Sequence, residues 1–262
     1  MILELRRMQR LVRLAGHLML GMLAAHLVLR TVNKLAHRLP RHQRYAQAVV
    51  QWWNRKLCRI INLRIHIEGE INARPTLFVA NHISWLDITC LAARLDARFV
   101  AKQEVRDWPL FGAMAQRNHT LFIKRGDAGA TAAVADQMTW SLLQKNNVIV
   151  FPEGTSSNGA TVERFHARLF QPAIRARVEV QAVAISYPHA QGINPIAPFV
   201  GDDNLLRHLW DALREPAIDI RLTFCKPIPA EGMDRRALAT HARNQILAAF
   251  GNAAGLRVDI SA

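Results

Sequence analysis

TLFVANHISWLD, residues 76–87, is the most informative part of the sequence. Its first five residues form an apolar run typical of a buried strand, and a helix-like run begins near Ser84. The junction places His82 and Asp87 five positions apart. A neutral imidazole can accept a proton from a hydroxyl group, and a nearby carboxylate can hold its tautomer and stabilise the imidazolium that forms. The alternative interpretation is purely local, because Ser84 and Asp87 have the spacing of a helix N-terminal capping pair.

Two further segments carry polar residues at the ends of apolar runs. LFIKRGD, residues 121–127, is predicted to be a short strand that ends in two cations and a glycine. VIVFPEGTSS, residues 148–157, is predicted to be a buried strand that opens into a polar loop. Ligand sites of largely parallel sheets lie beyond the ends of the strands, which is where all three segments place their polar side chains.

In order and approximate spacing, the three segments resemble the glycerolipid acyltransferase family typified by 1-acyl-glycerol-3-phosphate acyltransferases. The resemblance covers about residues 60–230. It implies transfer of a fatty acyl group from a coenzyme A or acyl-carrier-protein thioester to the free hydroxyl of a lysophospholipid, with the thioester as co-substrate and no other cofactor. His82 is then the general base, and Asp87 orients its imidazole. No acyl-enzyme is needed, and the chain has no G-x-S-x-G motif to form one.

The other two segments supply the expected substrate-binding residues. A guanidinium can grip a phosphate with two hydrogen bonds, so Arg125 is expected to hold the acceptor phosphate, while Lys124 either shares that task or is solvated. Glu153, Gly154 and Thr155 correspond to the family's acceptor-binding block. There Gly154 permits close backbone approach, and Thr155 can hydrogen-bond a headgroup. Glu153 is expected to hold Arg125 or an acceptor hydroxyl, or else to be a loop carboxylate paired with another arginine.

Two departures from the family pattern concern the acceptor. Ser156 stands where the family often carries an arginine, and Gln181 stands in the place of a proline within the apolar run at residues 180–183. The expected acceptor is 1-acyl-glycerol-3-phosphate, which would give phosphatidate. The run at residues 153–157, followed by Gly159, is more similar to members that acylate lyso-ornithine lipids, so that lipid is the alternative acceptor.

Composition limits the class of protein. The chain has 262 residues, half of them hydrophobic, which is enough for one sizeable α/β domain with an appendage. Its three cysteines, Cys58, Cys90 and Cys225, are isolated and lack metal-ligand spacing, so we expect buried thiols rather than disulfides or a zinc site. Motifs of metalloproteases, Walker-type nucleotide sites and dinucleotide sites are absent from the sequence.

Positive charge is concentrated in the first quarter of the chain. Through Arg64 there are thirteen Lys and Arg residues and a single acid, Glu4, which gives +12, whereas the remaining residues carry +2. Such asymmetry indicates an anionic partner surface, either lipid or nucleic acid. The apolar run at residues 14–29 lies between two basic flanks and favours lipid, so no nucleic-acid partner is expected.

The apolar run itself favours attachment to one leaflet. As a helix it would reach about 24 Å, less than a hydrocarbon core of about 30 Å, and both of its flanks are basic, with Arg6, Arg7, Arg10 and Arg13 before it. We therefore expect an interfacial anchor on the cytoplasmic face, with a single span or a cleaved signal as less favoured alternatives. Residues 42–61 are expected to form a second helix, so that residues 1–62 make a basic helical hairpin that anchors an acyltransferase domain at residues 63–262.

The remainder of the chain alternates between strand-like and helix-like segments. Such alternation predicts an α/β fold with a mixed, largely parallel sheet flanked by helices on both faces. Strands are expected near residues 63–67, 76–80, 98–101, 119–123, 147–151, 179–186 and 217–225. Helices are expected near residues 84–94, 110–117, 128–145, 165–176, 203–213 and 233–250.

Two other classes of function remain open from the sequence. A non-catalytic lipid- or nucleic-acid-binding protein would use the basic segment alone, and its binding would fall steeply with salt and survive loss of His82. A thioesterase would release free fatty acid without an acceptor. The leading expectation is the membrane-bound lysophospholipid acyltransferase.

Overall fold

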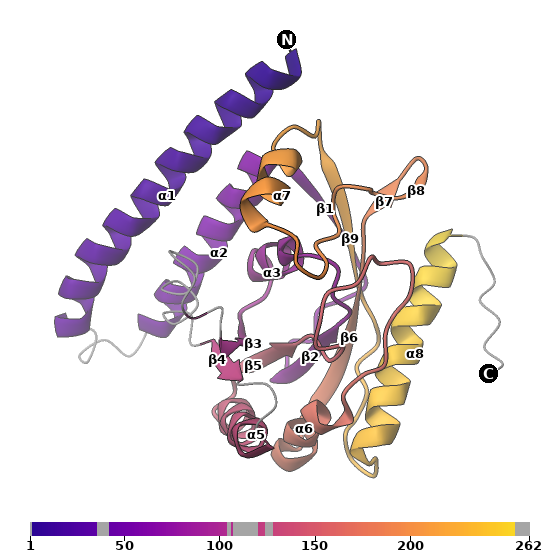
Figure 1. The fold of residues 1–262 in the computed structure, drawn as a ribbon. Helices are drawn as coiled ribbons and strands as arrows, with labels where there is room; N and C mark the ends of the chain where they lie inside the picture. The colour runs from indigo at the N-terminus through magenta and orange to yellow at the C-terminus, as the bar shows by residue number, and fades with distance from the viewer. Residues whose placement is uncertain (1, 36–41, 104–105, 107–119, 124–127, 255–262) are drawn as a thin grey trace.

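A seven-stranded mixed sheet lies between two layers of helices (Figure 1). The computed structural model describes residues 2–35, 42–103, 106, 120–123 and 128–254. The strand order across the sheet is β1-β9-β6-β2-β5-β3-β4. The strands are β1 (Leu63–Glu68), β2 (Thr76–Ala80), β3 (Ala97–Lys102), β4 (Leu121–Ile123), β5 (Asn147–Val150), β6 (Glu179–Ser186) and β9 (Ile218–Phe224).

All neighbouring strands of this sheet run parallel except β6 and β9, which pair antiparallel. The five strands from β6 to β4 therefore run in one direction, and their carboxyl ends meet at one edge of the sheet. The predicted mixed, largely parallel sheet is confirmed. Each predicted strand is present, with bounds that differ from the predicted ones by only a few residues.

The helices are α1 (Ile2–Leu35), α2 (His42–Ile61), α3 (Trp85–Ala92), α5 (Ala128–Leu143), α6 (Gln171–Ala176), α7 (Leu205–Ala212) and α8 (Arg235–Ala254).

The sheet has an apolar core on each face because the side chains of its central strands point alternately to the two faces. In β2, Phe78 and Ala80 are buried with residues of α2, α3 and α7, whereas Leu77 and Val79 are buried with residues of α5 and α8. Burial of both faces removes apolar area from water, which is the main favourable term in folding.

One local prediction needs correction, and one small element is additional to those predicted. The helix expected at residues 165–176 is split into a 3₁₀ helix, η3 (Ala167–Phe170), and α6, because Pro172 in the first turn of α6 has no N–H for a continuous helix. A hairpin of β7 (Pro188–His189) and β8 (Gly192–Ile193) was not expected, since two-residue strands have no periodicity. The helix expected at residues 110–117 lies outside the described residues.

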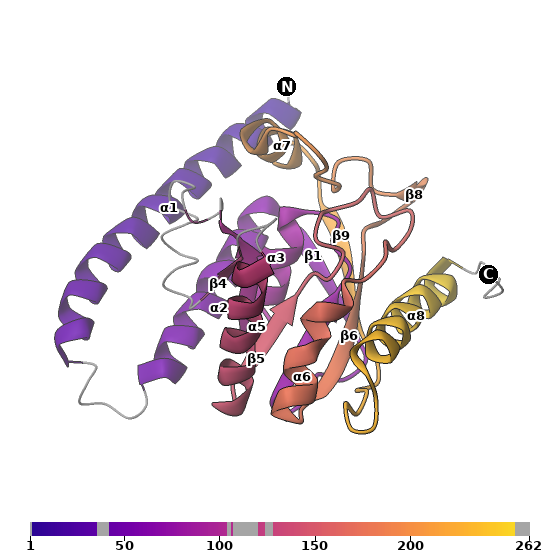
Figure 2. The same cartoon turned by 60° about the horizontal axis from the view of Figure 1, so that its bottom comes forward.

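The two N-terminal helices pack side by side, as Figures 1 and 2 show. The ring of His17 stacks on that of Trp53 with centroids 4.6 Å apart, and its Nε2 lies 3.2 Å from the Trp53 carbonyl oxygen. A Cβ at Gly21 would lie 2.9 Å from Trp53 Nε1, so the helices approach closely there. The predicted pair of N-terminal helices is confirmed, and the domain boundary at residue 62 stays a prediction.

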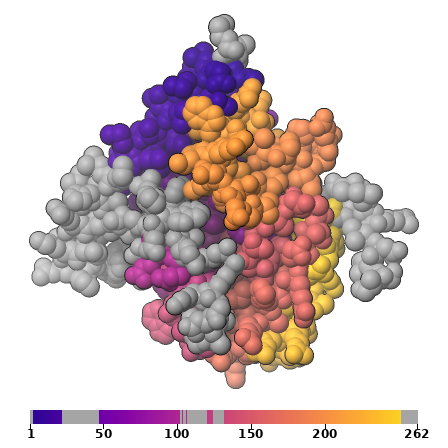
Figure 3. Space-filling model, viewed as in Figure 1, coloured from indigo at the N-terminus to yellow at the C-terminus, as the bar shows by residue number. Residues whose placement is uncertain are grey.

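Part of the basic N-terminal flank faces the protein itself. The Arg10 guanidinium is buried and donates hydrogen bonds to the carbonyl oxygens of Leu213, Glu215 and Pro216, just after α7. Arg7 is also buried and lies over the ring of Trp210, 4.2 Å from its centroid. The sequence predicts that both arginines face an anionic surface, but these contacts dock α1 onto α7 instead. The colours of the two helices adjoin in Figure 3.

The outer side of α1 is apolar. Leu5, Met8, Val12 and Met19 are exposed and share one face of the helix at 100° per residue. None of the helices in the described part of the chain is both long and apolar enough to cross a membrane.

Candidate active site

His82 and Asp87 are in direct contact at the carboxyl edge of the sheet. His82 follows the last residue of β2 by two positions, and Asp87 lies in the first turn of α3. His82 Nδ1 is 2.9 Å from Asp87 Oδ2. The Asp87 side chain is fully buried, whereas 18% of the His82 side chain is exposed. The contact expected from their spacing is therefore present, with the imidazole accessible and the carboxylate enclosed.

The Asp87 carboxylate accepts four hydrogen bonds. Oδ2 accepts from the backbone N–H groups of Ile83 (2.7 Å) and Ser84 (3.0 Å) as well as from His82, and Oδ1 accepts from the hydroxyl of Tyr187 (2.6 Å). Asp87 thus serves both as a cap of α3 and as the partner of His82, so the two interpretations of the motif hold together. Hydrogen bonds of this number stabilise an ionised carboxylate inside a protein.

The contact with Asp87 determines which nitrogen of His82 is available. An ionised carboxylate can only accept, so Nδ1 carries the proton of the neutral imidazole and Nε2 presents its lone pair. Nε2 forms no hydrogen bond with any residue that the structure describes. The ring stacks on Phe151, with centroids 4.1 Å apart and an interplanar angle of 20°. The imidazole is therefore held on one face and at one nitrogen, and the lone pair of Nε2 can accept a proton.

The turn after β5 clamps the backbone of His82. Glu153 Oε1 accepts from the His82 N–H at 2.8 Å, and its Oε2 accepts from the Glu163 N–H at 3.0 Å. The Ser157 N–H donates to the His82 carbonyl oxygen at 2.9 Å. Burial raises the pKa of Glu153, and the two backbone hydrogen bonds oppose that rise. Glu153 therefore lies next to the His82–Asp87 pair, where it fixes the backbone of His82.

Of the other predicted site residues, Gly154 and Thr155 belong to the turn after β5. Gly154 has a φ of 77°, which favours glycine, and its N–H closes a tight turn onto the Phe151 carbonyl oxygen. Thr155 follows it and is exposed. Lys124 and Arg125 lie outside the described residues, so their predicted role in phosphate binding stays a prediction.

The two departures from the family pattern have structural partners. The Ser156 hydroxyl donates to the carbonyl oxygen of Phe199, in the segment that leads to α7. Gln181, in the middle of β6, is fully buried and donates to the carbonyl oxygens of Glu70 and Cys225. Ser156 thus lies beside the candidate site, whereas Gln181 joins the sheet to two connecting segments.

Sequence reasoning missed Tyr187 and Asn81. Asn81 is fully buried and bridges to β6, because its Nδ2 donates to the Ile185 carbonyl oxygen (2.9 Å) and its Oδ1 accepts from the Ile185 N–H (2.7 Å). This bridge fixes the end of β6 two residues before Tyr187. Asn81 is next to His82 in the sequence, so its position in the motif could have indicated a structural role. Tyr187 is 100 residues from Asp87, and no motif in the sequence connects the two.

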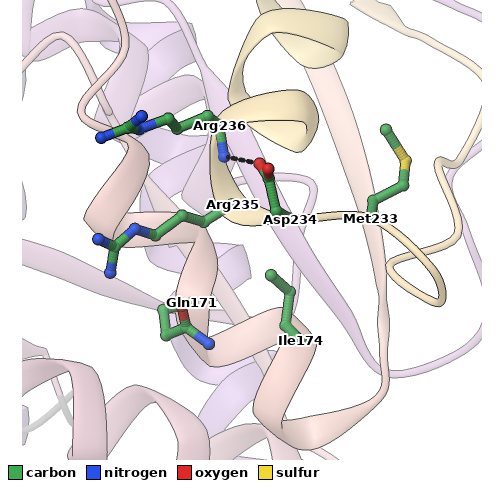
Figure 4. A pocket seen from close by; sticks show the side chains of 6 residues that line it. All are labelled: Gln171, Ile174, Met233, Asp234, Arg235 and Arg236. Atoms are coloured by element: carbon green, nitrogen blue, oxygen red, sulfur yellow. Dashed lines mark hydrogen bonds between the residues drawn. The ribbon is translucent and has the colours of Figure 1, made fainter.

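A cavity of about 400 Å³ lies apart from this arrangement, between α6 and the start of α8 (Figure 4). Its lining includes Gln171, Asp234 and Arg236, but neither His82 nor a described residue of the turn after β5. Asp234 Oδ1 accepts the Arg236 N–H there and caps α8. Within the described part of the chain, no group of three or more His, Cys, Asp or Glu side chains could hold a metal ion.

Comparisons with known proteins agree with this architecture. The family profile described as Acyltransferase matches residues 62–186. A lyso-ornithine lipid O-acyltransferase of Pseudomonas aeruginosa is 40% identical over 253 residues, which is 96% of each chain. A 1-acyl-sn-glycerol-3-phosphate acyltransferase of Neisseria meningitidis is 36% identical over 76% of this chain and 78% of its own.

A solved structure has the same fold. The crystal structure of the 1-acyl-sn-glycerophosphate acyltransferase from Thermotoga maritima matches with a TM-score of 0.70 and 17% identity, over 97% of this chain and all of the other. Together with the 40% identity to a relative over nearly the whole length of both chains, this places the protein within one family. The chain belongs to the acyltransferase family that contains the lyso-ornithine lipid and 1-acyl-sn-glycerol-3-phosphate acyltransferases.

Proposed function

We propose that the protein transfers a fatty acyl group from a thioester to the free hydroxyl of a lyso-ornithine lipid, with His82 as general base. The observation that carries this proposal is the contact between His82 Nδ1 and the buried Asp87 carboxylate, together with an Nε2 that no described residue engages. A base held in this way needs only a substrate hydroxyl at Nε2.

The proposed step balances without a covalent enzyme intermediate. Nε2 of His82 removes the hydroxyl proton as the acceptor oxygen bonds to the thioester carbonyl carbon, and Asp87 offsets the positive charge that forms on the imidazole. The carbon–sulfur bond then breaks, and the proton passes from the imidazolium to the departing sulfur. Thiols have pKa values near 8.5, so a thiolate leaves readily and no strong acid is required.

The donor is proposed to be an acyl thioester of coenzyme A or of acyl carrier protein. Both donors carry the same reactive thioester carbonyl, so the base at His82 serves either one. A thioesterase with the same base would attack with water instead of the lipid hydroxyl, and it would release free fatty acid when no acceptor is present.

Two observations support lyso-ornithine lipid as the acceptor. The relative that is 40% identical over 96% of both chains carries that name. Ser156 stands where the family often carries an arginine. Its hydroxyl donates a hydrogen bond to the Phe199 carbonyl oxygen, and it adds no positive charge next to His82 and Asp87. An ornithine headgroup carries an amine and a carboxylate but no phosphate, so it does not require that arginine.

The second candidate acceptor is 1-acyl-glycerol-3-phosphate, the one expected first from the sequence. A relative of that name is 36% identical over three quarters of this chain. Lys124 and Arg125 are two consecutive cations in the sequence, and Arg125 would hold the acceptor phosphate with two hydrogen bonds. Thr155 is proposed to hydrogen-bond the headgroup of either acceptor.

An anionic membrane surface on the cytoplasmic face is the proposed location of the reaction. The exposed apolar face of α1, formed by Leu5, Met8, Val12 and Met19, suits insertion into one leaflet. The exposed Arg13 borders this face and suits the phosphates of anionic lipids. Both substrates are amphipathic, so attachment of α1 would bring the enzyme to the layer that holds the lysolipid.

An acceptor panel tests the proposal. Purified protein is given one acyl thioester and, in separate reactions, lyso-ornithine lipid, lysophosphatidate and a zwitterionic lysophospholipid, with products read by mass spectrometry. The diacylated ornithine lipid is expected to form fastest. Preferential formation of phosphatidate would favour the second candidate, and release of free fatty acid alone would indicate a thioesterase.

A further inference from the structure

We propose that Tyr187 is a positioning residue for the catalytic base: its hydroxyl sets how strongly Asp87 holds the His82 imidazole. The inference rests on the proposed function, because it concerns the same base. It also assigns a role to a side chain that lies far from every motif in the sequence.

The Tyr187 hydroxyl is fixed at Asp87 by the surrounding structure. The side chain is 1% exposed, and its hydroxyl lies 2.6 Å from Asp87 Oδ1, which is the shortest of the four hydrogen bonds to this carboxylate. Asn81 bonds both backbone groups of Ile185 and so fixes the strand end that carries Tyr187. Asn81, which directly precedes His82 in the sequence, thus also helps to hold the tyrosine in place.

The two oxygens of Asp87 have separate partners. Oδ2 receives His82 Nδ1 and two backbone N–H groups, whereas Tyr187 is the donor to Oδ1 among the described residues. Donation at Oδ1 draws negative charge away from Oδ2 and weakens its pull on the Nδ1 proton. Tyr187 therefore limits how far Asp87 favours the protonated imidazole, which cannot act as a base, and it also prevents rotation of the carboxylate.

Other titratable groups around this network do not complicate its behaviour. Cys58 of α2 and Cys90 of α3 face Tyr187, and burial together with the neighbouring thiol raises the pKa of Cys90 well above its ordinary value. Burial and the adjacent Asp87 likewise raise the pKa of Tyr187 well above 10, so its phenol remains a neutral donor. Glu153 acts on the backbone N–H of His82 rather than on its ring.

The first test is Tyr187→Phe in the full-length protein. The variant is expected to lower kcat about tenfold with little change in KM for either substrate, because the Asp87 carboxylate can then rotate and no longer orients the imidazole precisely. The acid limb of the kcat/KM profile should move to higher pH by about 0.5–1 unit, because more of His82 becomes protonated. Thr76→Val is the matched control, since it removes a buried hydroxyl bonded to the Arg74 carbonyl oxygen at the other end of β2.

A second test changes the donor without removing it. The chain contains two tyrosines, Tyr45 and Tyr187, so growth on 3-fluorotyrosine in a Tyr45→Phe background labels position 187 alone. Fluorination makes the phenol a stronger acid and a stronger donor, so the acid limb should move to lower pH, opposite to Tyr187→Phe. The fluorotyrosine protein keeps every atom of the hydrogen-bond network. It therefore tests the role of Tyr187 even if the Tyr187→Phe protein does not fold.

A readout without turnover separates this inference from the proposed function. In protein labelled with ¹⁵N-histidine, with His82 assigned by comparison with His82→Gln, the Nδ1 proton should move downfield in Tyr187→Phe and upfield with fluorotyrosine. Displacements in the same direction, or none in either protein, would overturn the role of Tyr187. Absence of acyl transfer by the wild-type protein would overturn the proposed function, and the proton shift would still decide the role of Tyr187.

Discussion

At the scale of single residues, Asp87 is the group most sensitive to a small chemical change. In the wild-type protein the Asp87 carboxylate accepts from four donors. Asp87→Asn keeps the shape of the side chain but replaces that carboxylate with a neutral amide. We expect kcat to fall by about 10³-fold or more, because the amide no longer stabilises the imidazolium. The exposed Asp136→Asn on α5 serves as the control. Thermal unfolding checks that both variants fold, and a near-normal kcat in Asp87→Asn would contradict the assignment.

Glu153 is expected to contribute to the pH dependence of stability. Burial raises its pKa above the ordinary 4.5, so the native state binds the proton more tightly than the unfolded chain does. Its stabilising contribution is complete below pH 4.5 and is lost as the pH rises through the folded pKa. Urea unfolding between pH 4 and 7 should therefore show a smaller loss of stability in Glu153→Gln than in the wild-type protein. The exposed Glu231→Gln should leave the loss unchanged.

The sequence predicted some residue contacts and could not predict others. His82 and Asp87 are separated by one strand-to-helix junction, so local geometry alone brings their side chains together. Glu153 is 71 residues from His82 and meets it only because β2 and β5 are neighbours in the sheet. A carboxylate that accepts from a backbone N–H leaves no pattern of residue types in the sequence, so this contact could not be predicted. The expected pairing of Glu153 with Arg125 stays a prediction, because Arg125 lies outside the described residues.

At the scale of elements, Arg10 is expected to fasten α1 to the domain. Its guanidinium donates to three carbonyl oxygens that follow α7. Arg10→Ala should lower the free energy of unfolding by about 1.5–3 kcal/mol, since hydrogen bonds to a charged group are lost. Hydrogen exchange should become faster in α1 and at residues 213–216. Arg13→Ala, one turn further along and exposed, should change neither quantity. Equal effects in the two variants would contradict the docking role.

The elements themselves could largely be predicted because their signals are local. The apolar runs of the sequence form buried strands in the structure, and β2 contributes residues to the cores on both faces of the sheet. The arginines before residue 14 carried no such signal. Arg7 and Arg10 look like a solvated charge cluster in sequence, and the position of α7, about 200 residues later, turns them inward.

At the scale of the whole molecule, the exposed face of α1 is expected to attach the protein to anionic membranes. Met8→Glu with Val12→Glu places two acids on this face, where the native side chains are 53% and 69% exposed. Binding to anionic vesicles should weaken by at least about tenfold, as expected when apolar area is no longer buried. Leu143→Glu, at a 58% exposed site on α5 at the other face of the sheet, is the control. Co-sedimentation measures binding, and equal loss in both proteins would contradict this surface.

The most direct measurement is the rate of acyl transfer from a thioester to lyso-ornithine lipid by the His82→Ala protein. We expect transfer to fall by about 10³-fold or more, while thermal unfolding and vesicle binding stay close to wild type. His241→Ala, at an exposed histidine of α8, should transfer at the normal rate. Normal transfer by a folded His82→Ala protein would contradict the assignment of His82 as the base.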